Sequence, residues 1–200
     1  APGGRVRIGA DVAADVVEDV VNMAGVVAAN SVREENGVIL LGGPAANGEV
    51  AVSGRLDVAG REPGTTGGRV EVTGARVRIE DGAEIDASGP AGGGLVLVGG
   101  GERGLGPLRR SERTEIVAGS RLTARATAAG DGGRLVLWSD GVTDFAGSLD
   151  ASAGPRGGDG GFIEISGKQG FSLGGDIVID APLGEPGTLL LDPTRLRFVE

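Results

Sequence analysis

The sequence contains no cysteine, no histidine and no tyrosine, and it has a single tryptophan, Trp138. Without cysteine the chain can form neither disulfides nor thiolate metal sites. Because histidine is absent as well, the common acid–base and nucleophilic arrangements of enzymes cannot be built. Aromatic residues make up only 2% of the chain. Any core must therefore consist mainly of Val, Ile, Leu and Ala.

Positive charge is also scarce, with 19 Lys and Arg against 28 Asp and Glu and a formal net charge of −9. This charge argues against nucleic acid or an anionic membrane as a general partner. No apolar run reaches the roughly 18 residues that cross a bilayer, and the first residues lack the composition of a signal peptide. We expect a mature product or a piece of a longer protein.

Glycine is abundant, at 41 of 200 residues, but it does not follow the period of collagen. In residues 157–166 (Gly-Gly-Asp-Gly-Gly-Phe-Ile-Glu-Ile-Ser) a glycine turn leads into a short strand of alternating apolar and polar residues. The same pattern returns at residues 67–72, 93–98, 132–137 and 186–191. Such repetition is typical of a stacked solenoid.

A second repeated unit, an apolar residue followed by Asp and usually Ala, alternates with the first. Its copies begin at Leu56, Ile85, Leu149 and Ile179, with a variant at Leu122. The interval is 25 residues from Val70 to Leu95 and 27 residues from Phe162 to Leu189. A turn of this length holds two or three short strands, which fits a parallel β-helix. The predicted fold class is all-β, with residues 1–200 forming a single β-helix segment.

One stretch near the N-terminus has a different period. Val12, Val16 and Val20 recur at helical spacing, and acidic residues occupy the other side. This predicts one short helix around residues 10–22, although the β-branched valines leave a strand as the alternative.

The interval from Leu95 to Leu135 is 40 residues, and the excess lies in residues 99–113, which are rich in Gly and Arg. We expect this segment to loop out as an insertion. Loops on a rigid scaffold often carry binding sites, and an ordinary connector is the alternative. The candidate contact residues are Glu102, Arg103, Arg109, Arg110, Glu112 and Arg113. A polysaccharide lyase or hydrolase could use such carboxylates and arginines, which makes a carbohydrate-active enzyme the alternative function.

Two motifs in the sequence bear on the binding of a cofactor. Residues 99–104 match the GxGxxG spacing, but Leu105, Gly106 and Pro107 cannot open the helix that would hold a pyrophosphate. The recurring Asp residues allow either a column of calcium ligands or caps on turns. The acids concerned are Asp57, Asp86, Asp131, Asp150, Asp159 and Asp180. We expect turn caps and no cofactor, with Ca²⁺ as the alternative.

Residues 157–166, then Ala181 and Pro182, then residues 187–193 (Gly-Thr-Leu-Leu-Leu-Asp-Pro) resemble the filamentous-haemagglutinin-like exoproteins of bacterial two-partner secretion. Residues 20–29 and 48–57 resemble them too. The resemblance implies a right-handed parallel β-helix within a larger adhesin, exported through an outer-membrane pore partner and secreted or held on the bacterial cell surface. It implies no catalysis and transfers no binding residues.

From this resemblance we expect a rigid, non-enzymatic rod that presents loops for adhesion or for end-to-end self-association. Its partners would be a glycan or protein receptor, and not nucleic acid. The amino-terminal secretion domain of such exoproteins is expected to lie outside these residues.

Overall fold

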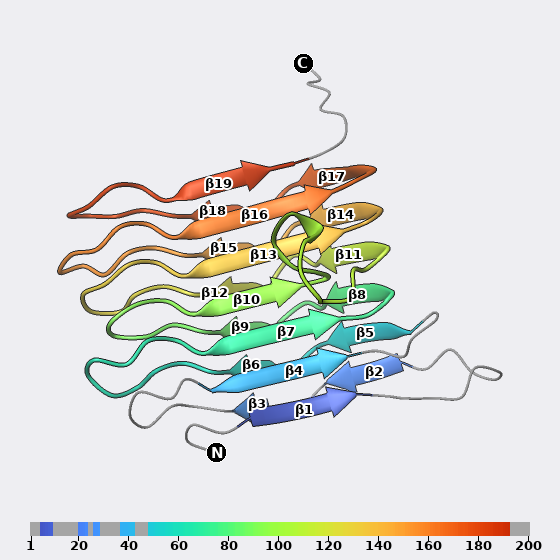
Figure 1. Cartoon of the computed structure of the whole chain (residues 1–200), viewed down its shortest axis with the longest axis horizontal. Coiled ribbons are helices and arrows are strands. Elements are labelled where there is room, and N and C mark those ends of the chain that lie inside the picture. The colour runs from blue at the N-terminus through green and yellow to red at the C-terminus, as the bar shows by residue number, and fades with distance from the viewer. Residues whose placement is uncertain (1–4, 10–19, 24–25, 29–36, 43–47, 193–200) are drawn as a thin grey trace.

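The computed structural model describes residues 5–9, 20–23, 26–28, 37–42 and 48–192. These residues form three sheets of parallel strands, and each sheet runs along the axis of the stack (Figure 1). Sheet A consists of β1 (Arg5–Gly9), β4 (Val38–Gly42), β7 (Arg69–Thr73), β10 (Leu95–Val98), β13 (Arg134–Ser139), β16 (Phe162–Gly167) and β19 (Thr188–Leu191), in this order. Sheet B consists of β2 (Val20–Met23), β5 (Glu49–Val52), β8 (Arg76–Ile79), β11 (Arg113–Ile116), β14 (Val142–Phe145) and β17 (Gly170–Leu173). Sheet C consists of β3 (Val26–Ala28), β6 (Arg55–Asp57), β9 (Glu84–Asp86), β12 (Arg121–Thr123), β15 (Ser148–Asp150) and β18 (Asp176–Val178).

Consecutive strands lie in different sheets, and each strand pairs in parallel with the strand three places later in the chain. One strand from each sheet therefore makes one coil, and the coils pile up into a solenoid. This confirms the prediction of an all-β parallel β-helix. No helix in the described ranges is long and apolar enough to cross a membrane.

The core is a column of aliphatic side chains inside the coils. In sheet A, Ile39, Val70, Val96, Leu135 and Ile163 occupy equivalent register positions in successive coils, and each is 0% exposed. Equivalent residues of parallel strands lie about 4.8 Å apart, so branched aliphatic side chains pack on their own kind. This explains how a chain with 2% aromatic residues builds a core.

The register agrees with the alignment of the glycine turns in the sequence, but it differs by one residue from the intervals counted from Val70 to Leu95 and from Phe162 to Leu189. Leu95 pairs with Arg69 and not with Val70, and Phe162 pairs with Arg134 and with Thr188. A slip of one residue exchanges the inner and outer faces of a strand. Leu95 and Phe162 therefore lie on the outer face of sheet A, whereas Val96 and Ile163 point into the core.

The predicted helix around residues 10–22 is wrong where the structure describes it, because Val20, Val21 and Asn22 belong to strand β2. Residues 10–19 lie outside the described residues. Strand β2 pairs along its length with β5. Pairing in a sheet and the β-branched valines together outweigh the helical spacing of the apolar residues.

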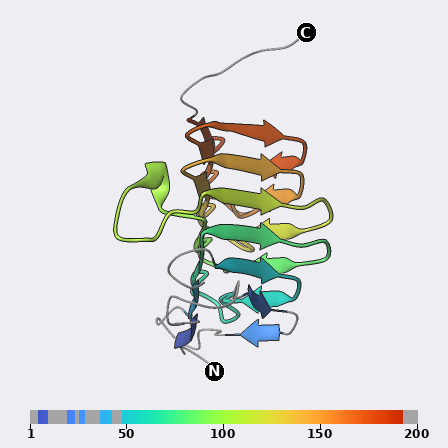
Figure 2. The same ribbon diagram turned by 90° about the vertical axis from the view of Figure 1, so that its right-hand side faces the viewer.

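Residues 99–112 connect β10 to β11, whereas Gly74 and Ala75 alone connect β7 to β8. The longer connection, called the excursion below, contains a single 3₁₀ turn, η1 (Glu102–Gly104). Figure 2 shows the excursion standing out from the side of the stack, on the outer side of sheet A.

Candidate functional site: the outer faces of sheets A and C

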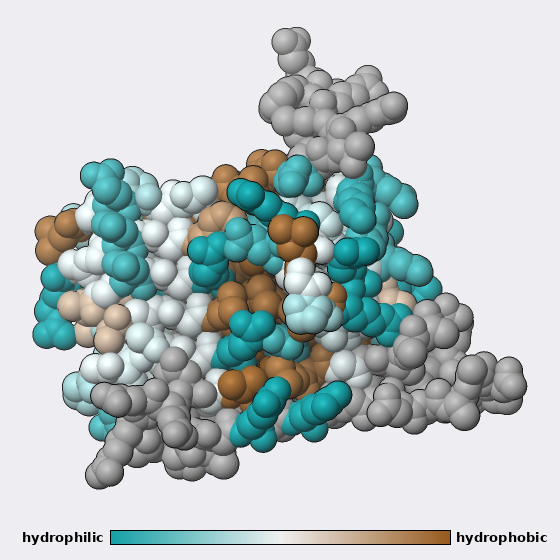
Figure 3. Space-filling view, viewed as in Figure 1, coloured by the Kyte–Doolittle hydropathy of each residue, from teal (hydrophilic) through white to brown (hydrophobic). Residues whose placement is uncertain are grey.

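The outer face of sheet A carries a second apolar cluster, separate from the core. Leu97, Val136 and Trp138 are 5%, 1% and 4% exposed, although alternation along β10 and β13 directs them outward. Leu95, Leu108 and Phe162 pack against them. Figure 3 shows apolar side chains running across several coils of this face. Leu108 belongs to the excursion, which therefore folds back to cover part of the sheet.

Two glycines let the backbone of the excursion lie directly on the indole ring. A Cβ atom on Gly104 would lie 2.4 Å from Cζ2 of Trp138, and one on Gly100 would lie 2.7 Å from Cδ1. Gly104 also has a φ of +65°, a conformation that L side chains rarely adopt. This close fit makes the excursion a packed part of the structure.

A carboxylate is buried beneath the same segment. Glu164 of β16 is 0% exposed, and its two oxygens accept the main-chain N–H of Arg103 at 3.1 and 3.0 Å. Burial raises the pKa of the Glu164 carboxyl above its ordinary value, although the hydrogen bond from Arg103 opposes the shift. The ionised form of Glu164 is therefore disfavoured in the folded chain.

The predicted contact residues tether the excursion and the start of β11 to later coils. Glu102 forms an ion pair with Arg134, Arg110 with Asp140 at 3.0 Å, and Arg113 with Asp144 at 2.5 Å. Arg103 contributes its main-chain N–H, Glu112 is exposed and Arg109 is partly buried. Glu102, Arg110 and Arg113 are thus each held in an ion pair with a residue of a later coil.

Asp140 receives hydrogen bonds from two cations. Burial raises the pKa of Asp140, but the hydrogen bonds from Lys168 and Arg110 outweigh it and hold the pKa below its ordinary value. Asp140 therefore remains an anion that anchors Arg110 of the excursion.

The recurring aspartates of sheet C cap turns, as predicted. Oδ1 of Asp57, Asp86 and Asp150 accepts the main-chain N–H two residues later, each at 3.0 Å. This is the local hydrogen bond of an Asx turn. The groups capped are the N–H groups of Ala59, Ser88 and Ser152.

The acids do not form a single column of metal ligands. Asp57 pairs in register with Asp86, but Thr123 separates Asp86 from Asp150, and Val178 rather than Asp180 follows Asp150. Among the residues that the structure describes, no group of three or more His, Cys, Asp or Glu could hold a metal ion. Asp131 and Asp159 instead accept main-chain N–H groups of the next coil, from Asp159 at 2.8 Å and from Glu185 at 2.9 Å.

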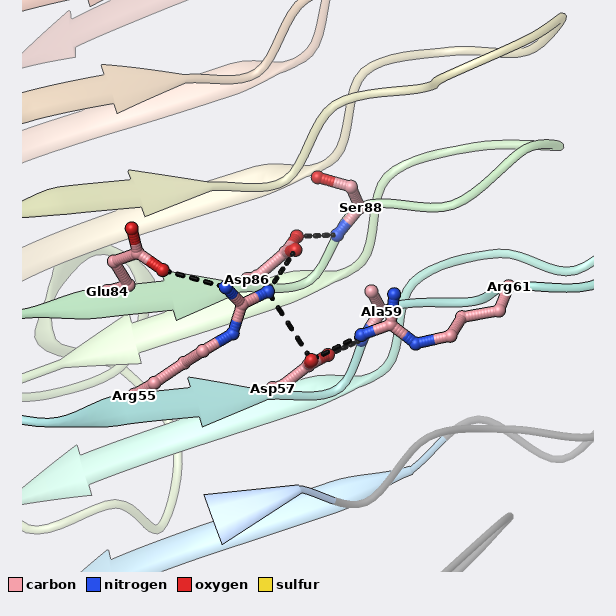
Figure 4. Close-up of polar contacts among 7 residues, drawn as sticks. All are labelled: Arg55, Asp57, Ala59, Arg61, Glu84, Asp86 and Ser88. Atoms are coloured by element: carbon pink, nitrogen blue, oxygen red, sulfur yellow. Dashed lines mark hydrogen bonds and ion pairs between the residues drawn. The ribbon is translucent and has the colours of Figure 1, made fainter. Parts of the chain in front are cut away.

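Arginines cross-link the aspartates of neighbouring coils (Figure 4). The guanidinium of Arg55 lies 2.8 Å from Glu84 and 3.4 Å from both Asp57 and Asp86. Arg61 approaches Asp57 from the adjacent turn. Arg55 thus links Asp57 of β6 to Glu84 and Asp86 of β9 on the outer face of sheet C.

This network lines one side of a groove of about 510 Å³ on the outer face of sheet C, with Arg55, Arg61, Glu84 and Asp86 among the lining residues. Its lining includes Arg121, Thr123, Arg125, Thr127 and Ser88. None of these was predicted as a site residue. The signal in the sequence is the strict alternation of residues 121–127, together with Thr123 in the place where the repeat has Asp.

No protein-family model and no curated protein matches the chain. The chain is similar to the HMW1 secretion domain from Haemophilus influenzae, known from its crystal structure, with a TM-score of 0.69 and 28% sequence identity. The similarity covers 94% of this chain and 48% of that chain, so this chain spans about half the length of the solved one.

This similarity supports a β-helix like those of two-partner secretion exoproteins, without singling out filamentous haemagglutinin. The expectation that the amino-terminal secretion domain lies outside these residues stays a prediction, because the similarity covers 48% of the HMW1 domain. In fold and in part of its sequence, the chain is thus similar to a bacterial secretion domain.

Proposed function

We propose that this chain is a non-enzymatic, β-helical segment of a secreted bacterial exoprotein, exported through an outer-membrane pore partner. The observation that supports the proposal best is the similarity to the HMW1 secretion domain, which extends over 94% of the chain at 28% identity. The repeated glycine turns and the Leu-Asp-Pro ending at residues 191–193 point to the same class of exoprotein.

The physical role in this proposal is display. Parallel ladders connect every coil to the next, so the solenoid holds side chains on its outer faces at fixed positions. After export the segment would lie on the cell surface and present the excursion, with Arg110 and Arg113, to a glycan or protein receptor. Ion pairs of these residues with Asp140 and Asp144 hold the excursion in place before a receptor arrives.

The coil of β17 and β18 supports a further contact. Phe171, Ile177, Ile179 and Leu191 pack against the core but are only partly buried, unlike their counterparts in earlier coils. An apolar end of this kind is stabilised when another coil stacks on it. A further coil of the exoprotein or end-to-end association of two copies would supply one, and light scattering over a range of concentrations tests the association.

The export proposal is tested by producing the chain behind a cleavable signal peptide in a Gram-negative host, with and without the outer-membrane pore protein of the same organism. Immunoblots of the medium and the periplasm measure where the chain accumulates. We expect the chain in the medium only when the pore is present. Equal amounts in the medium with and without the pore would contradict the proposal.

The adhesive role is tested separately with purified chain on beads. We expect beads carrying the chain to adhere to host cells, and we expect the double variant R110Q/R113Q to adhere less. Equal adhesion of the parent, the variant and uncoated beads would remove the adhesive role without touching export.

A further inference from the structure

Along the floor of the groove on sheet C, side chains that point into the core alternate with side chains that point outward. Residues 121–127 read Arg-Leu-Thr-Ala-Arg-Ala-Thr. Leu122, Ala124 and Ala126 are 0%, 0% and 2% exposed, because they point into the core. The other four residues line the groove, namely Arg121, Thr123, Arg125 and Thr127. Two guanidinium groups and two hydroxyl groups therefore face outward from one rung of the solenoid.

This rung departs from the repeat that its neighbours follow. The coils before and after it carry Asp-Ala-Ser, at residues 86–88 and 150–152, whereas residues 123–125 are Thr-Ala-Arg. The register places Thr123 between Asp86 and Asp150. This rung thus has Thr123 in place of a carboxylate and Arg125 in place of a serine. Local departures from an otherwise consistent pattern are where functional sites are expected.

The exchange leaves positive charge available in the groove. The carboxylates of Asp57 and Asp86 are already paired with Arg55, and Asp57 also with Arg61. Arg125 approaches Asp150 only to 4.0 Å. Within the part of the chain that the structure describes, Arg121 makes no ion pair. Two exposed arginines therefore face the groove of a chain whose net charge is −9.

A buried hydroxyl on the groove wall is a second, independent observation. Ser88 is 6% exposed and lines the groove, and its Oγ makes no hydrogen bond with any described residue. A buried polar atom without a partner is destabilising and uncommon in native structures, so it calls for a ligand that completes it. Figure 4 shows the Oγ of Ser88 directed away from Asp86, while its main-chain N–H caps that residue.

The backbone that carries these groups is fixed on both sides. The N–H groups of Ala124 and Ala126 donate to the coil above, at 2.8 and 3.0 Å, and that of Thr127 donates to the coil below at 2.9 Å. Strand β12 pairs with β9 on one side and with β15 on the other. A ligand would meet a preorganised surface, which lowers the entropy lost on binding.

We propose that this groove binds an acidic polysaccharide, with Arg121 and Arg125 on its acidic groups and with Ser88, Thr123 and Thr127 on its hydroxyl groups. Guanidinium groups form paired hydrogen bonds with carboxylate or sulfate oxygens. Hydroxyl side chains both donate and accept, as the hydroxyl groups of sugars require. The inference rests on the display role in the proposed function, and it adds a glycan site on sheet C to the contact proposed for the excursion.

Other ligand classes fit the groove less well. Single-stranded nucleic acid is bound largely by stacking of bases on aromatic rings, and the lining of the groove contains none. An added peptide strand needs a free sheet edge, but β12 is paired on both sides. A neutral glycan would offer no anionic group to Arg121, which makes no ion pair with a described residue, or to Arg125, whose ion pair with Asp150 is 4.0 Å long.

The experiment is a calorimetric titration of the purified 200-residue chain with oligogalacturonate, dextran sulfate and uncharged dextran. We expect binding of at least one of the two acidic polymers and none of dextran. Binding of oligogalacturonate identifies a carboxylate as the acidic group, and binding of dextran sulfate alone identifies a sulfate. If the parent chain binds neither acidic polymer, the proposal is wrong, and the export experiment is unaffected by that result.

Matched variants locate the site. R121Q/R125Q should lower the affinity for the bound polymer by about tenfold, the effect of losing roughly 1.4 kcal/mol. R76Q/R156Q changes the net charge equally and should bind like the parent, because Arg76 and Arg156 are exposed and neither lines the groove. Equal losses in both variants would show general attraction between charges and would overturn the groove as the site.

A third variant distinguishes binding in the groove from general electrostatic attraction to the chain. Ser88→Ala keeps the net charge, so weaker binding by this variant supports a ligand seated against the groove wall. Unchanged affinity in Ser88→Ala would contradict that seat and with it the groove. Circular dichroism establishes that all variants are folded, which we expect because Arg121 and Arg125 are exposed.

Discussion

The main-chain N–H of Arg103 donates to both carboxylate oxygens of Glu164, at 3.1 and 3.0 Å, across 61 residues of sequence. Arg103 has a φ of +53°, and Glu164 lies on the outer face of sheet A, two coils beyond β10, from which the excursion leaves. The excursion therefore extends over the outer face of sheet A as far as β16. Its stability depends on the ionisation of a buried acid and on its contact with Trp138.

Glu164→Gln should make the protein more stable than the parent at neutral pH. Since burial raises the pKa of Glu164 in the folded state, its contribution to stability is complete below the pKa of the unfolded carboxyl. That contribution is lost as the pH rises through the raised pKa of the folded state. A neutral amide keeps an oxygen acceptor for Arg103 and avoids the loss. Thermal melts followed by circular dichroism between pH 4 and pH 8 measure the difference.

The exposed Glu112 provides the control for this experiment. Glu112→Gln should follow the parent at every pH. If Glu164→Gln melts below the parent at pH 8, the ionised carboxylate stabilises the fold, and the argument from burial is wrong.

Gly104→Ala should displace the excursion from Trp138. The added Cβ would lie 2.4 Å from Cζ2 of the indole ring, so one of the two must move. Trp138 is the single tryptophan and is 4% exposed, so its fluorescence reports on this contact directly. We expect emission at longer wavelength than in the parent as water reaches the ring.

Gly106→Ala is the matched control for Gly104→Ala. Gly106 has a φ of +86°, but nothing lies within 4 Å of its added Cβ. Both variants therefore carry backbone strain of about 1–2 kcal/mol, and only Gly104→Ala adds a clash. The same emission shift in both variants would mean that strain, and not the contact with the ring, moves the excursion.

Asp150→Ala should lower the free energy of unfolding by about 1 kcal/mol, the usual net contribution of a hydrogen bond of this kind. Oδ1 of Asp150 accepts from the N–H of Ser152 at 3.0 Å and from its Oγ at 2.7 Å. Urea titration measures the change. Asp176→Ala on the neighbouring strand β18 is the control, because Asp176 is exposed and its side chain makes no hydrogen bond or ion pair with described residues. Equal effects of the two variants would contradict a capping role.

The chain should not depolymerise acidic polysaccharides. Arg110 and Arg113 are held in ion pairs with Asp140 and Asp144, which leaves them poorly placed to act on a substrate. Reducing-end assays on oligogalacturonate measure turnover. Turnover by the parent that disappears in Arg109→Gln, Arg110→Gln or Glu112→Gln would establish the enzyme alternative and displace the structural role.

The sequence alone was sufficient for the fold class and for the turn caps. In the strands that follow the glycine turns, the equivalent residues Leu135, Ile163 and Leu189 lie 28 and 26 residues apart, and such a period constrains the number of residues in a coil. The hydrogen bond from Ser88 to Asp86 is equally local, because an aspartate caps a turn two residues later by its own geometry.

The strand at residues 20–22 and the contacts of the excursion required the tertiary structure. The interval counted from Val70 to Leu95 is one residue short of the register, and the pairing of Leu95 with Arg69 places Leu95 on the outer face. Leu97 and Trp138, apolar but outward, are intelligible only with Leu108 packed over them.

The groove lined by Arg121 and Arg125 could not be predicted from the sequence either, because Ser88 contributes to its lining from a different coil. The sequence by itself determined that this chain forms a solenoid, since glycine turns and aliphatic strand residues recur along it and act locally. The tertiary structure alone decided which outer side chains meet, since those contacts depend on how successive coils are superimposed.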